Sequence, residues 1–468
     1  MKEKKIFLLL FDGLGLRNFA FTRFNEIGIE KKIQTLFWNS SVFPIAELGF
    51  KEIKIKNAKI YFLTDVLKHA KNHITLNLFT KINNDEIYQR YKFPFSYRNL
   101  KTLLKSILCN TIILFFSNQK GLKMIDKMIN SLERKTVYYS DCKNKLKEEM
   151  PQLVFSSTQR LAQAIAPLLA AKDLGIPTAS FIFSWDNLPK ATMVVETDYY
   201  FVWSEYMKHE LLHYHPSIKE NRIVVTGTPQ FEFHFEKKDL MSREVFFKTY
   251  SLEHSKKYIC FSGDDETTSP DDPKYLEDLA MTIERLNKKK YNLGIIFRRC
   301  PVDFSSRYDE ILKKYSRIIV PIDPLWKPIR LFWSTILPTK EDGVLFSNIA
   351  EHCEMVVNLG STTLFDFVAH NKPCGYFRYN QKFQNDKNWD IFKCYKFVHF
   401  RSMYSKNSVI WLNNTNDIAQ KIEDVLNDKN KQHIENAQKW FEVINQHPPE
   451  KASERIWNAI EEIIKQNQ

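Results

Sequence analysis

Short apolar runs alternating with helical segments organise the first half of the chain. Five runs have the length of a buried strand and end at polar residues, glycine or proline: residues 6–11, 111–116, 153–156, 178–183 and 222–226. Parallel strands that are buried on both faces have this nearly continuous apolar pattern. Residues 158–172 have a helical composition, with Gly175 just past their end. The pattern predicts strand-helix-strand units in a doubly wound α/β domain.

A second series of the same kind follows a polar segment at residues 231–255. It predicts strands at 258–261, 292–297, 318–322, 355–358 and 373–377, with helices near 275–288, 343–352 and 362–370. We therefore predict an α/β protein with two Rossmann-like, doubly wound domains, at residues 1–235 and 236–428. Residues 429–468 should form terminal helices, which can pack back on the first domain.

The charge balance favours an anionic partner. The chain has 68 Lys and Arg against 55 Asp and Glu, a formal charge of +13, which suits nucleic acid, an anionic membrane or phosphorylated small molecules. The basic clusters are scattered, and none is joined to the aromatic spacing of an RNA-recognition strand. This distribution argues against nucleic acid and fits a solvated basic face with mild affinity for anionic lipid or phosphate.

No segment indicates export or a membrane span. The apolar residues 6–11 are too few for the core of a signal peptide, and no run approaches the ~18 apolar residues of a membrane helix. The seven cysteines are scattered and lack C-x-x-C spacing, which argues against a disulfide framework or structural zinc. We expect a cytoplasmic protein, with peripheral contact at the inner face of an anionic membrane left open.

The most informative motif lies at residues 356–373, where a predicted strand ends at Asn358 and a helix follows. Gly360 permits a tight turn, and three hydroxyl residues, Ser361, Thr362 and Thr363, open the helix. Their hydroxyls and the free N–H groups there can hold a diphosphate. Asp366, one turn on, can accept hydrogen bonds from two ribose hydroxyls. An ordinary capped helix would also have these residues.

This stretch resembles the donor-nucleotide signature of the UDP-glycosyltransferases, H-C-G-x-x-S-x-x-E-(x)6-P. Counted back from Pro373, the chain keeps Gly360 and has Asn358 for His, Leu359 for Cys, Thr363 for Ser and Asp366 for Glu. The resemblance implies the GT-B fold, in which two Rossmann-like domains face each other across a cleft. It also implies that the C-terminal domain binds the nucleotide-sugar donor, that the N-terminal domain binds the acceptor, and that transfer occurs in the cleft.

Two further loops of the second domain are candidate donor contacts. Ser262 and Gly263 follow a predicted strand and form a small-residue turn that a diphosphate or base could approach. Arg298 and Arg299 end another strand, at the edge where open α/β sheets bind ligands. An arginine there can pair with phosphate through two hydrogen bonds. A plain turn and a partly exposed structural arginine are the alternatives.

The first domain offers a glycine-containing loop after its first strand, Asp12-Gly13-Leu-Gly15-Leu-Arg17-Asn18. It lacks the third glycine of a dinucleotide fingerprint, because Asn18 stands in that place, so NAD binding is weakly supported. Within the GT-B resemblance, we expect Gly13, Gly15, Arg17 and Asn18 to contact the acceptor, and Asp12 to act as general base on an acceptor hydroxyl. A solvent-facing turn aspartate is the alternative.

A second loop of this domain contains Trp185 and Asp186. The indole suits stacking on an acceptor sugar, and the carboxylate suits hydroxyl binding or catalysis. Residues 178–231, including Val225-Thr-Gly-Thr-Pro-Gln-Phe231, resemble loops of bacterial surface-polysaccharide and CDP-glycerol-type transferases. That resemblance implies a glycan or lipid-linked acceptor.

The segment His209-Glu-Leu-Leu-His213 matches the H-E-x-x-H pattern of helical zinc sites, although no third ligand follows at the metzincin spacing. A surface helix explains it better. The chain has no D-x-D sequence, which is the usual metal clamp of GT-A transferases. We expect no metal and no cofactor, and we expect backbone N–H groups and arginine to balance the diphosphate charge.

These observations lead to one hypothesis and three alternatives. The hypothesis is a metal-independent glycosyltransferase that moves a sugar from a nucleotide-activated donor to a glycan or lipid-linked acceptor in bacterial surface polysaccharide synthesis. A nucleotide-sugar epimerase or a glycerol-phosphate transferase would use the same fold. A zinc hydrolase at His209 and His213 and a non-catalytic sugar-nucleotide binding protein belong to other classes.

Overall fold

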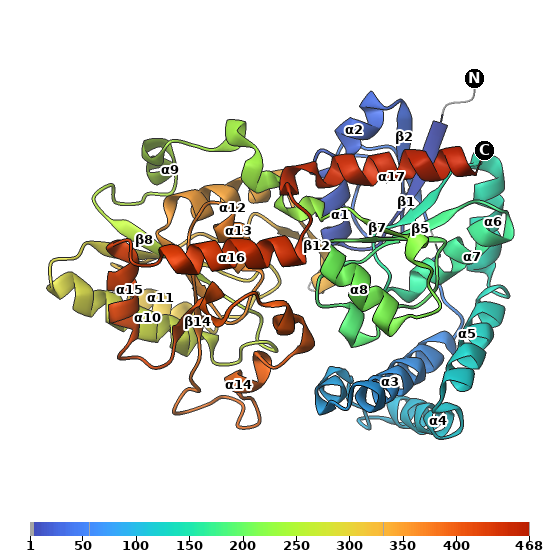
Figure 1. Ribbon diagram of the computed structural model, residues 1–468, viewed down its shortest axis with the longest axis horizontal. Coiled ribbons are helices and arrows are strands. Elements are labelled where there is room, and N and C mark those ends of the chain that lie inside the picture. The colour runs from blue at the N-terminus through green and yellow to red at the C-terminus, as the bar shows by residue number, and fades with distance from the viewer. Residues whose placement is uncertain (1–3, 56, 331, 468) are drawn as a thin grey trace. The chain divides into compact units, whose positions relative to one another are not determined.

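The computed structural model describes residues 4–55, 57–330 and 332–467 (Figure 1). The chain forms two compact units: Met1–Pro229 together with Gln446–Gln468 make the first, and Gln230–Asn445 make the second. The units divide after Pro229, whereas the sequence pattern predicts a boundary after residue 235. The two terminal helices lie in different units, because the chain returns to the first unit at Gln446.

The first unit is built on a parallel sheet with the strand order β3-β2-β1-β4-β5-β6-β7. The five apolar residues from Ile6 to Leu10 are fully buried in β1, an interior strand, as expected for a strand covered on both faces. The strands are β1 (Lys4–Leu10), β2 (Ile33–Asn39), β3 (Glu52–Lys54), β4 (Val154–Ser156), β5 (Thr178–Phe181), β6 (Tyr199–Val202) and β7 (Ile223–Val225).

Helices connect and cover these strands. They are α1 (Gly13–Ala20), α2 (Phe24–Glu30), α3 (Thr64–Asn83), α4 (Leu100–Phe116), α5 (Gln119–Glu133), α6 (Val137–Glu149), α7 (Ile165–Asp173), α8 (Glu205–Tyr214) and α17 (Ala452–Gln466). Helices α3, α4 and α5 pack on one another and extend from one end of the unit (Figure 1). Within the described ranges, no helix is long and apolar enough to cross a membrane.

The second unit has a parallel sheet with the order β10-β9-β8-β13-β14-β15, plus an antiparallel ribbon of β11 and β12. Its strands are β8 (Lys257–Ser262), β9 (Leu293–Arg298), β10 (Ile319–Pro321), β11 (Lys327–Pro328), β12 (Ile336–Leu337), β13 (Met355–Asn358), β14 (Cys374–Phe377) and β15 (Ile410–Leu412). Its helices are α9 (Arg243–Thr249), α10 (Asp272–Lys288), α11 (Asp309–Lys314), α12 (Lys340–His352), α13 (Thr363–Val368), α14 (Ile391–Cys394), α15 (Ile418–Leu426) and α16 (Lys431–Ile444).

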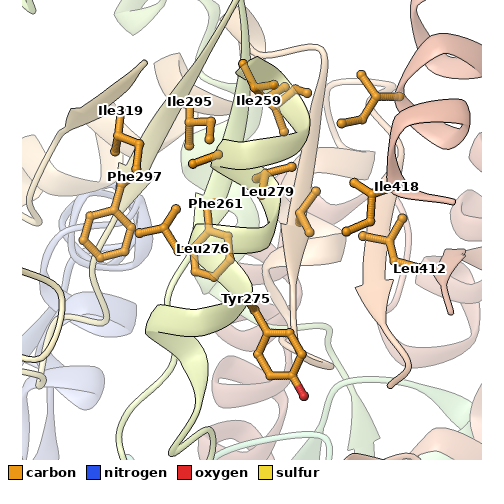
Figure 2. Close-up of a cluster of buried hydrophobic side chains, with 14 of the residues drawn as sticks. Ile259, Phe261, Tyr275, Leu276, Leu279, Ile295, Phe297, Ile319, Leu412 and Ile418 are labelled. Carbon is orange, nitrogen blue, oxygen red and sulfur yellow. The ribbon is translucent and has the colours of Figure 1, made fainter. Parts of the chain in front are cut away.

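The core of the second unit lies between this sheet and the helices α10 and α15. Figure 2 shows Phe261 and Phe297, from adjacent strands, packed with Leu276 and Leu279 of α10. Ile418 of α15 joins the same cluster. All of these side chains are fully buried. This packing fixes the strand ends from which the loops of the candidate site leave.

The prediction of a strand at residues 111–116 was wrong. These residues form the last part of the helix α4, which begins after Asn99. There the side chain of Asn99 accepts a hydrogen bond from the Thr102 N–H at 2.9 Å, and the Thr102 hydroxyl accepts one from the Asn99 N–H at 3.1 Å. This capping box starts the helix upstream of the apolar run. A six-residue apolar run has no periodicity that separates a strand from a helix.

The terminal helix α17 packs against α2, near the start of the chain. The indole of Trp457 is fully buried, stacks on Phe24 with ring centroids 5.0 Å apart, and donates a hydrogen bond to the Phe24 carbonyl at 2.6 Å. Gly28 makes room for this indole: a Cβ atom at Gly28 would lie 2.4 Å from its Cζ2 atom. The first unit therefore includes residues from both ends of the described chain.

We expect Gly28→Ala to destabilise the first unit by about 1–3 kcal/mol, because the new methyl group displaces a buried indole. Urea denaturation followed by tryptophan fluorescence measures the change. The control is Ile29→Ala, at an exposed neighbour, which should stay within about 0.5 kcal/mol of the wild type. Equal stability of Gly28→Ala and the wild type would contradict the tight contact.

Candidate functional site

In the second unit, the strand order reverses between β8 and β13. The chain continues from β8 to β9 on one side, whereas β13 continues to β14 on the other. The two loops that follow β8 and β13 therefore leave the sheet in opposite directions at its carboxyl edge. Open α/β sheets bind their ligands at such a switch point. This position makes the loops after Ser262 and Asn358 the first candidate site.

The loop after β13 is held by its own hydrogen bonds. The buried Asn358 side chain accepts a hydrogen bond from the Ser361 N–H at 3.0 Å, and the Tyr376 hydroxyl donates to the Ser361 carbonyl at 2.9 Å. Gly360 has a φ of +68°, which favours glycine. A Cβ atom there would also lie 3.0 Å from the ring of Phe400. The turn predicted at Gly360 is thus formed and is preorganised.

Hydroxyl groups from both loops converge at this turn. The oxygens of Ser361 and Thr363 lie 3.0 Å apart, and those of Ser262 and Thr363 lie 3.3 Å apart. Gly263 follows Ser262, and a Cβ atom there would approach the Tyr308 hydroxyl to 3.0 Å. Thr362 stands at the N-cap position of α13 without a side-chain capping hydrogen bond, and α13 spans only Thr363–Val368, which is shorter than the predicted helix. The structure thus brings together most of the predicted donor-loop residues.

A buried carboxyl pair lies beside these loops. Burial, together with the neighbouring carboxylate of Asp272, raises the pKa of Asp264 well above its usual value. Burial also raises the pKa of Asp272 to about 6, against hydrogen bonds from the Tyr308 hydroxyl at 2.7 Å and the Asp264 N–H at 3.0 Å. The Oδ2 atom of Asp264 is buried without a hydrogen-bond partner in the described part of the chain. A protonated Asp264 can therefore donate a hydrogen bond.

Asp366 is the first member of a chain of four polar side chains. Its Oδ1 atom lies 2.8 Å from Nε2 of His234, whose Nδ1 lies 3.1 Å from Nε2 of His370. The Nδ1 atom of His370 lies 2.7 Å from Oε2 of Glu351. His234 comes from the segment that follows Pro229, and Glu351 comes from α12. Asp366 thus already has a protein partner for one of its two oxygens.

The surroundings of His370 decide its charge. Burial, followed by the charge of His234, lowers the pKa of His370 to about 4, while Glu351 opposes the shift. His370 is therefore neutral in the folded protein near neutral pH. Sequence reasoning missed His234, because no local pattern links it to Asp366.

Arg298 and Arg299 have different environments. Arg298 is 5% exposed, and its Nη2 donates to both carboxylate oxygens of Asp342, at 2.8 and 2.9 Å. Its charge is therefore already balanced within the second unit. Arg299 donates to the Ser305 carbonyl at 2.5 Å and lines a cavity of about 400 Å³, which also contains Asp309 and Asp323. Arg299 is also paired, since its guanidinium lies 3.9 Å from Asp309 and 3.8 Å from Asp323, but it is the one of the two arginines that faces this cavity.

In the first unit, Asp12 lies at the corresponding switch point, between β1 and β4. It is 1% exposed and caps α1 by accepting a hydrogen bond from the Gly15 N–H at 2.9 Å. Burial raises the pKa of its carboxyl, against the Gly15 hydrogen bond and the charge of Arg160. Its Oδ2 atom has no hydrogen-bond partner among the described residues. A buried carboxyl with a raised pKa can serve as a base.

The other residues of this loop are mostly buried. Gly13 and Gly15 belong to α1, and a Cβ atom at Gly15 would lie 2.9 Å from the Ser157 hydroxyl. Close packing on the end of β4 thus explains this glycine. Arg17 is half-buried and donates to the side chain of the buried Asn18 at 3.3 Å. Arg17 is the most exposed of these predicted acceptor contacts.

A cavity of about 250 Å³ lies in the first unit and was not foreseen from the sequence. Three basic residues, Lys68, Lys71 and Arg160, line it together with one acidic residue, Asp65, and with Phe93. Burial lowers the pKa of Lys68, and the charge of Arg160 contributes to the shift. The charge of Arg160 also lowers the pKa of Asp12, so this basic cavity and the Asp12 carboxyl are electrostatically linked.

The predicted residues Trp185 and Asp186 follow β5. Trp185 is 5% exposed and offers little free surface to a sugar in this structure. Asp186 forms an ion pair with Lys190 and accepts a hydrogen bond from Asn187 at 2.8 Å. Both side chains are held in place, and their roles toward a substrate stay predictions.

His209 and His213 lie on α8, and both are exposed. The Nε2 atom of His213 lies 2.8 Å from Oδ1 of Asn83. Between them, burial raises the pKa of Glu210 to about 8. In the ranges that the structure describes, no group of three or more His, Cys, Asp or Glu side chains could hold a metal ion.

Comparisons with known proteins identify the fold. No protein-family model and no curated protein sequence matches the chain. Solved structures do match over nearly the whole length. They include UDP-GlcNAc 2-epimerase from Neisseria meningitidis bound to UDP-GlcNAc (TM-score 0.56, 11% identity, 98% of this chain and 100% of that one) and the UDP complex of S. aureus MnaA (0.54, 15%, 99% and 97%).

A glycosyltransferase from Rickettsia africae is also similar, with a TM-score of 0.52 and 11% identity over 99% of this chain and 100% of that one. At these identities the likeness concerns the fold alone. The chain therefore has the GT-B fold, and the predicted α/β class with two Rossmann-like units is confirmed.

The lowered pKa of His370 leads to a prediction about stability and pH. Its folded-state pKa of about 4 lies below the ordinary value of 6.5, so below pH 6.5 the unfolded chain binds a proton that the folded chain does not. Stability from this residue should be complete above pH 6.5 and should fall, by up to about 1.4 kcal/mol per pH unit, as the pH approaches 4.

The free energy of unfolding of the second unit, measured by urea denaturation between pH 7 and about 4, should therefore fall less steeply in His370→Gln than in the wild type. His209→Gln, at an exposed histidine, should keep the wild-type slope. The same pH slope in His370→Gln and the wild type would contradict a neutral, buried His370.

Proposed function

We propose that the chain is a glycosyltransferase that binds a nucleotide-activated sugar in its second unit. It transfers the sugar to a glycan or lipid-linked acceptor of a bacterial surface polymer, without a metal ion. The observation that carries the proposal is the meeting of the Ser262, Ser361 and Thr363 hydroxyls at the β8/β13 switch point. Support also comes from similar folds whose structures contain UDP or UDP-GlcNAc.

The proposed donor site uses hydrogen bonds to balance the diphosphate. The hydroxyls of Ser361 and Thr363 are proposed to face the phosphates, and Asp264, whose raised pKa favours the protonated form, adds a donor. Asp366 keeps one oxygen on His234 and offers the other to the ribose. Arg298 holds Asp342 instead of a phosphate, so Arg299 is the cation proposed for donor binding.

Transfer forms a bond between the acceptor oxygen and the anomeric carbon and breaks the bond from that carbon to the diphosphate. The acceptor hydroxyl loses its proton to a base, and the nucleoside diphosphate leaves with the bonding electron pair. We assign the base to Asp12, because its raised pKa makes its carboxylate a stronger base than an exposed one. The first unit, with the basic cavity at Lys68 and Arg160, is the proposed acceptor unit.

The second candidate is a nucleotide-sugar 2-epimerase, which would use the same donor site and would need no acceptor. The likeness to UDP-GlcNAc 2-epimerases from several organisms favours it. Product analysis separates the two: an epimerase converts the nucleotide-sugar alone into its isomer, whereas a transferase releases the nucleoside diphosphate only with an acceptor. A glycerol-phosphate transferase would require a CDP-linked donor.

We expect Thr363→Val to weaken binding of the nucleotide diphosphate about tenfold, because a hydroxyl that contacts phosphate is replaced by a methyl group of similar size. A thermal-shift screen over UDP-, CDP-, GDP- and ADP-sugars first identifies the nucleotide. Titration calorimetry then measures its Kd for wild type and variant. Asp366→Asn, which keeps a group that can hydrogen bond to His234, should weaken binding of the nucleoside but not of pyrophosphate.

The control for these variants is Thr249→Val, at an exposed threonine at the end of α9 in the same unit. It should bind the nucleotide as the wild type does. Wild-type affinity in Thr363→Val would exclude the hydroxyl cluster as the donor site. The absence of stabilisation by every nucleotide-sugar would overturn the proposed function.

Asp12→Asn should lower kcat by about 10²–10⁴ while leaving the melting temperature close to that of the wild type. Asparagine caps a helix about as well as aspartate, so α1 should keep its start. Transfer from a radiolabelled donor measures turnover, and differential scanning fluorimetry measures stability. Full turnover in this variant would exclude Asp12 as the base and would leave the donor site untouched.

A further inference from the structure

The helix α4 exposes an unusually apolar face. Its buried or half-buried positions form one stripe that follows the helical repeat and faces the rest of the first unit. They are Thr102, Lys105, Ser106, Cys109, Ile112, Ile113 and Phe116. The opposite side exposes Leu100, Leu103, Leu104, Ile107, Leu108, Leu114 and Phe115. We call these seven side chains the α4 apolar face. A helix that only covers a globular unit would have polar residues there.

Neighbouring segments extend this surface. Phe93 and Tyr97, just before α4, are exposed, as are Met124 and Met128 of α5, which packs beside α4. Contiguous exposed apolar surface of this kind marks an interaction site in a soluble protein. In Figure 1, α3, α4 and α5 project from one end of the first unit.

The charges around the α4 apolar face are almost all positive. Residues 93–132 contain six basic residues and one acidic residue, Asp126, which forms an ion pair with Lys71. Four of the lysines form no ion pair with the residues that the structure describes: Lys101, Lys120, Lys123 and Lys127. The basic cavity at Lys68, Lys71 and Arg160 adjoins this region through Phe93.

We propose that the α4 apolar face docks on the surface of an anionic phospholipid bilayer. The apolar side chains enter the boundary between headgroups and acyl chains, and the lysines contact anionic headgroups. Seventeen residues make α4 too short to span a bilayer, which needs about 20. The occupant is not a second copy of this chain, because a symmetric contact would place this basic segment against itself. This proposal does not depend on the proposed function.

Flotation with phospholipid vesicles tests the proposal on the full chain. The wild type should float with vesicles of phosphatidylcholine and phosphatidylglycerol, and much less with phosphatidylcholine alone. Ile107→Asp combined with Leu114→Asp should lower the partition coefficient about tenfold or more, because two exposed apolar contacts become charged. Lys123→Gln and Lys127→Gln should each lower it by about fivefold, and this effect should vanish at about 0.5 M salt.

The matched control is Ile29→Asp combined with Val137→Asp, which makes the same change of charge at two exposed apolar residues. Ile29 lies on α2, at the other end of the unit from α4 in Figure 1. All variants are first compared by circular dichroism and melting temperature, since exposed substitutions should leave the fold intact.

Vesicle binding that is unchanged in the Ile107→Asp, Leu114→Asp variant, or equally lost in the control, overturns the proposal. So does a wild type that does not float with anionic vesicles. Gel filtration tests the alternative occupant, a second copy of this chain. That occupant is assigned if the wild type is a dimer that does not float with vesicles and the α4 variant is a monomer. These readouts do not involve activity, so their failure leaves the glycosyltransferase proposal as it stands.

Discussion

Each unit depends on one geometric constraint, a parallel sheet in which the winding direction reverses beside the first strand. At that reversal, two loops leave the carboxyl edge on opposite sides, and the backbone groups at the strand ends need partners. The first unit fills this position with its own groups, since Asp12 caps α1 and Gly15 packs on Ser157. The second unit gathers hydroxyls there, which is why a ligand site is favoured in that unit.

Charged groups inside the second unit are mostly engaged with one another, and this pairing limits which of them can meet a substrate. Arg298 and Asp342 form a buried pair, to which the Trp326 indole also donates a hydrogen bond at 2.7 Å. Removing either partner alone would leave an unpaired buried charge and would destabilise the loops that the pair joins. Asp366 is likewise oriented by His234 before any ligand arrives. Preorganised groups of this kind lose little entropy on binding.

The fold class could be predicted from the sequence, because the pattern within each segment and the order of the segments along the chain indicate the same fold. Buried parallel strands are nearly continuous apolar runs, and the runs at residues 6–11 and 355–358 form interior strands of the two sheets. The prediction for residues 111–116 was wrong because six apolar residues suit either a strand or a buried helical turn. The strand β2 was missed because polar Gln34 and Thr35 interrupt its pattern.

The candidate site was predictable only where it follows from strand ends. The proximity of Ser262 and Thr363 could be predicted, since the carboxyl ends of parallel strands lie at one edge of the sheet. The His234–Asp366 contact and the Arg298–Asp342 pair join residues far apart in the sequence, and no spacing rule reaches them. The exposure of α4 was also hidden, because an apolar helix in a sequence does not reveal which face the fold will cover. The roles of Asp12, Asp186 and Trp185 toward substrates stay predictions.

The contact between Trp457 and Gly28 has a consequence for synthesis on the ribosome. Translation runs from the amino end, so the second unit has all of its residues before the first unit receives its closing helix. Until α17 emerges, the face of the Phe24 ring that Trp457 covers has no partner from that helix. We therefore expect nascent chains that are paused late in translation to recruit chaperones through the part of the molecule that was made first.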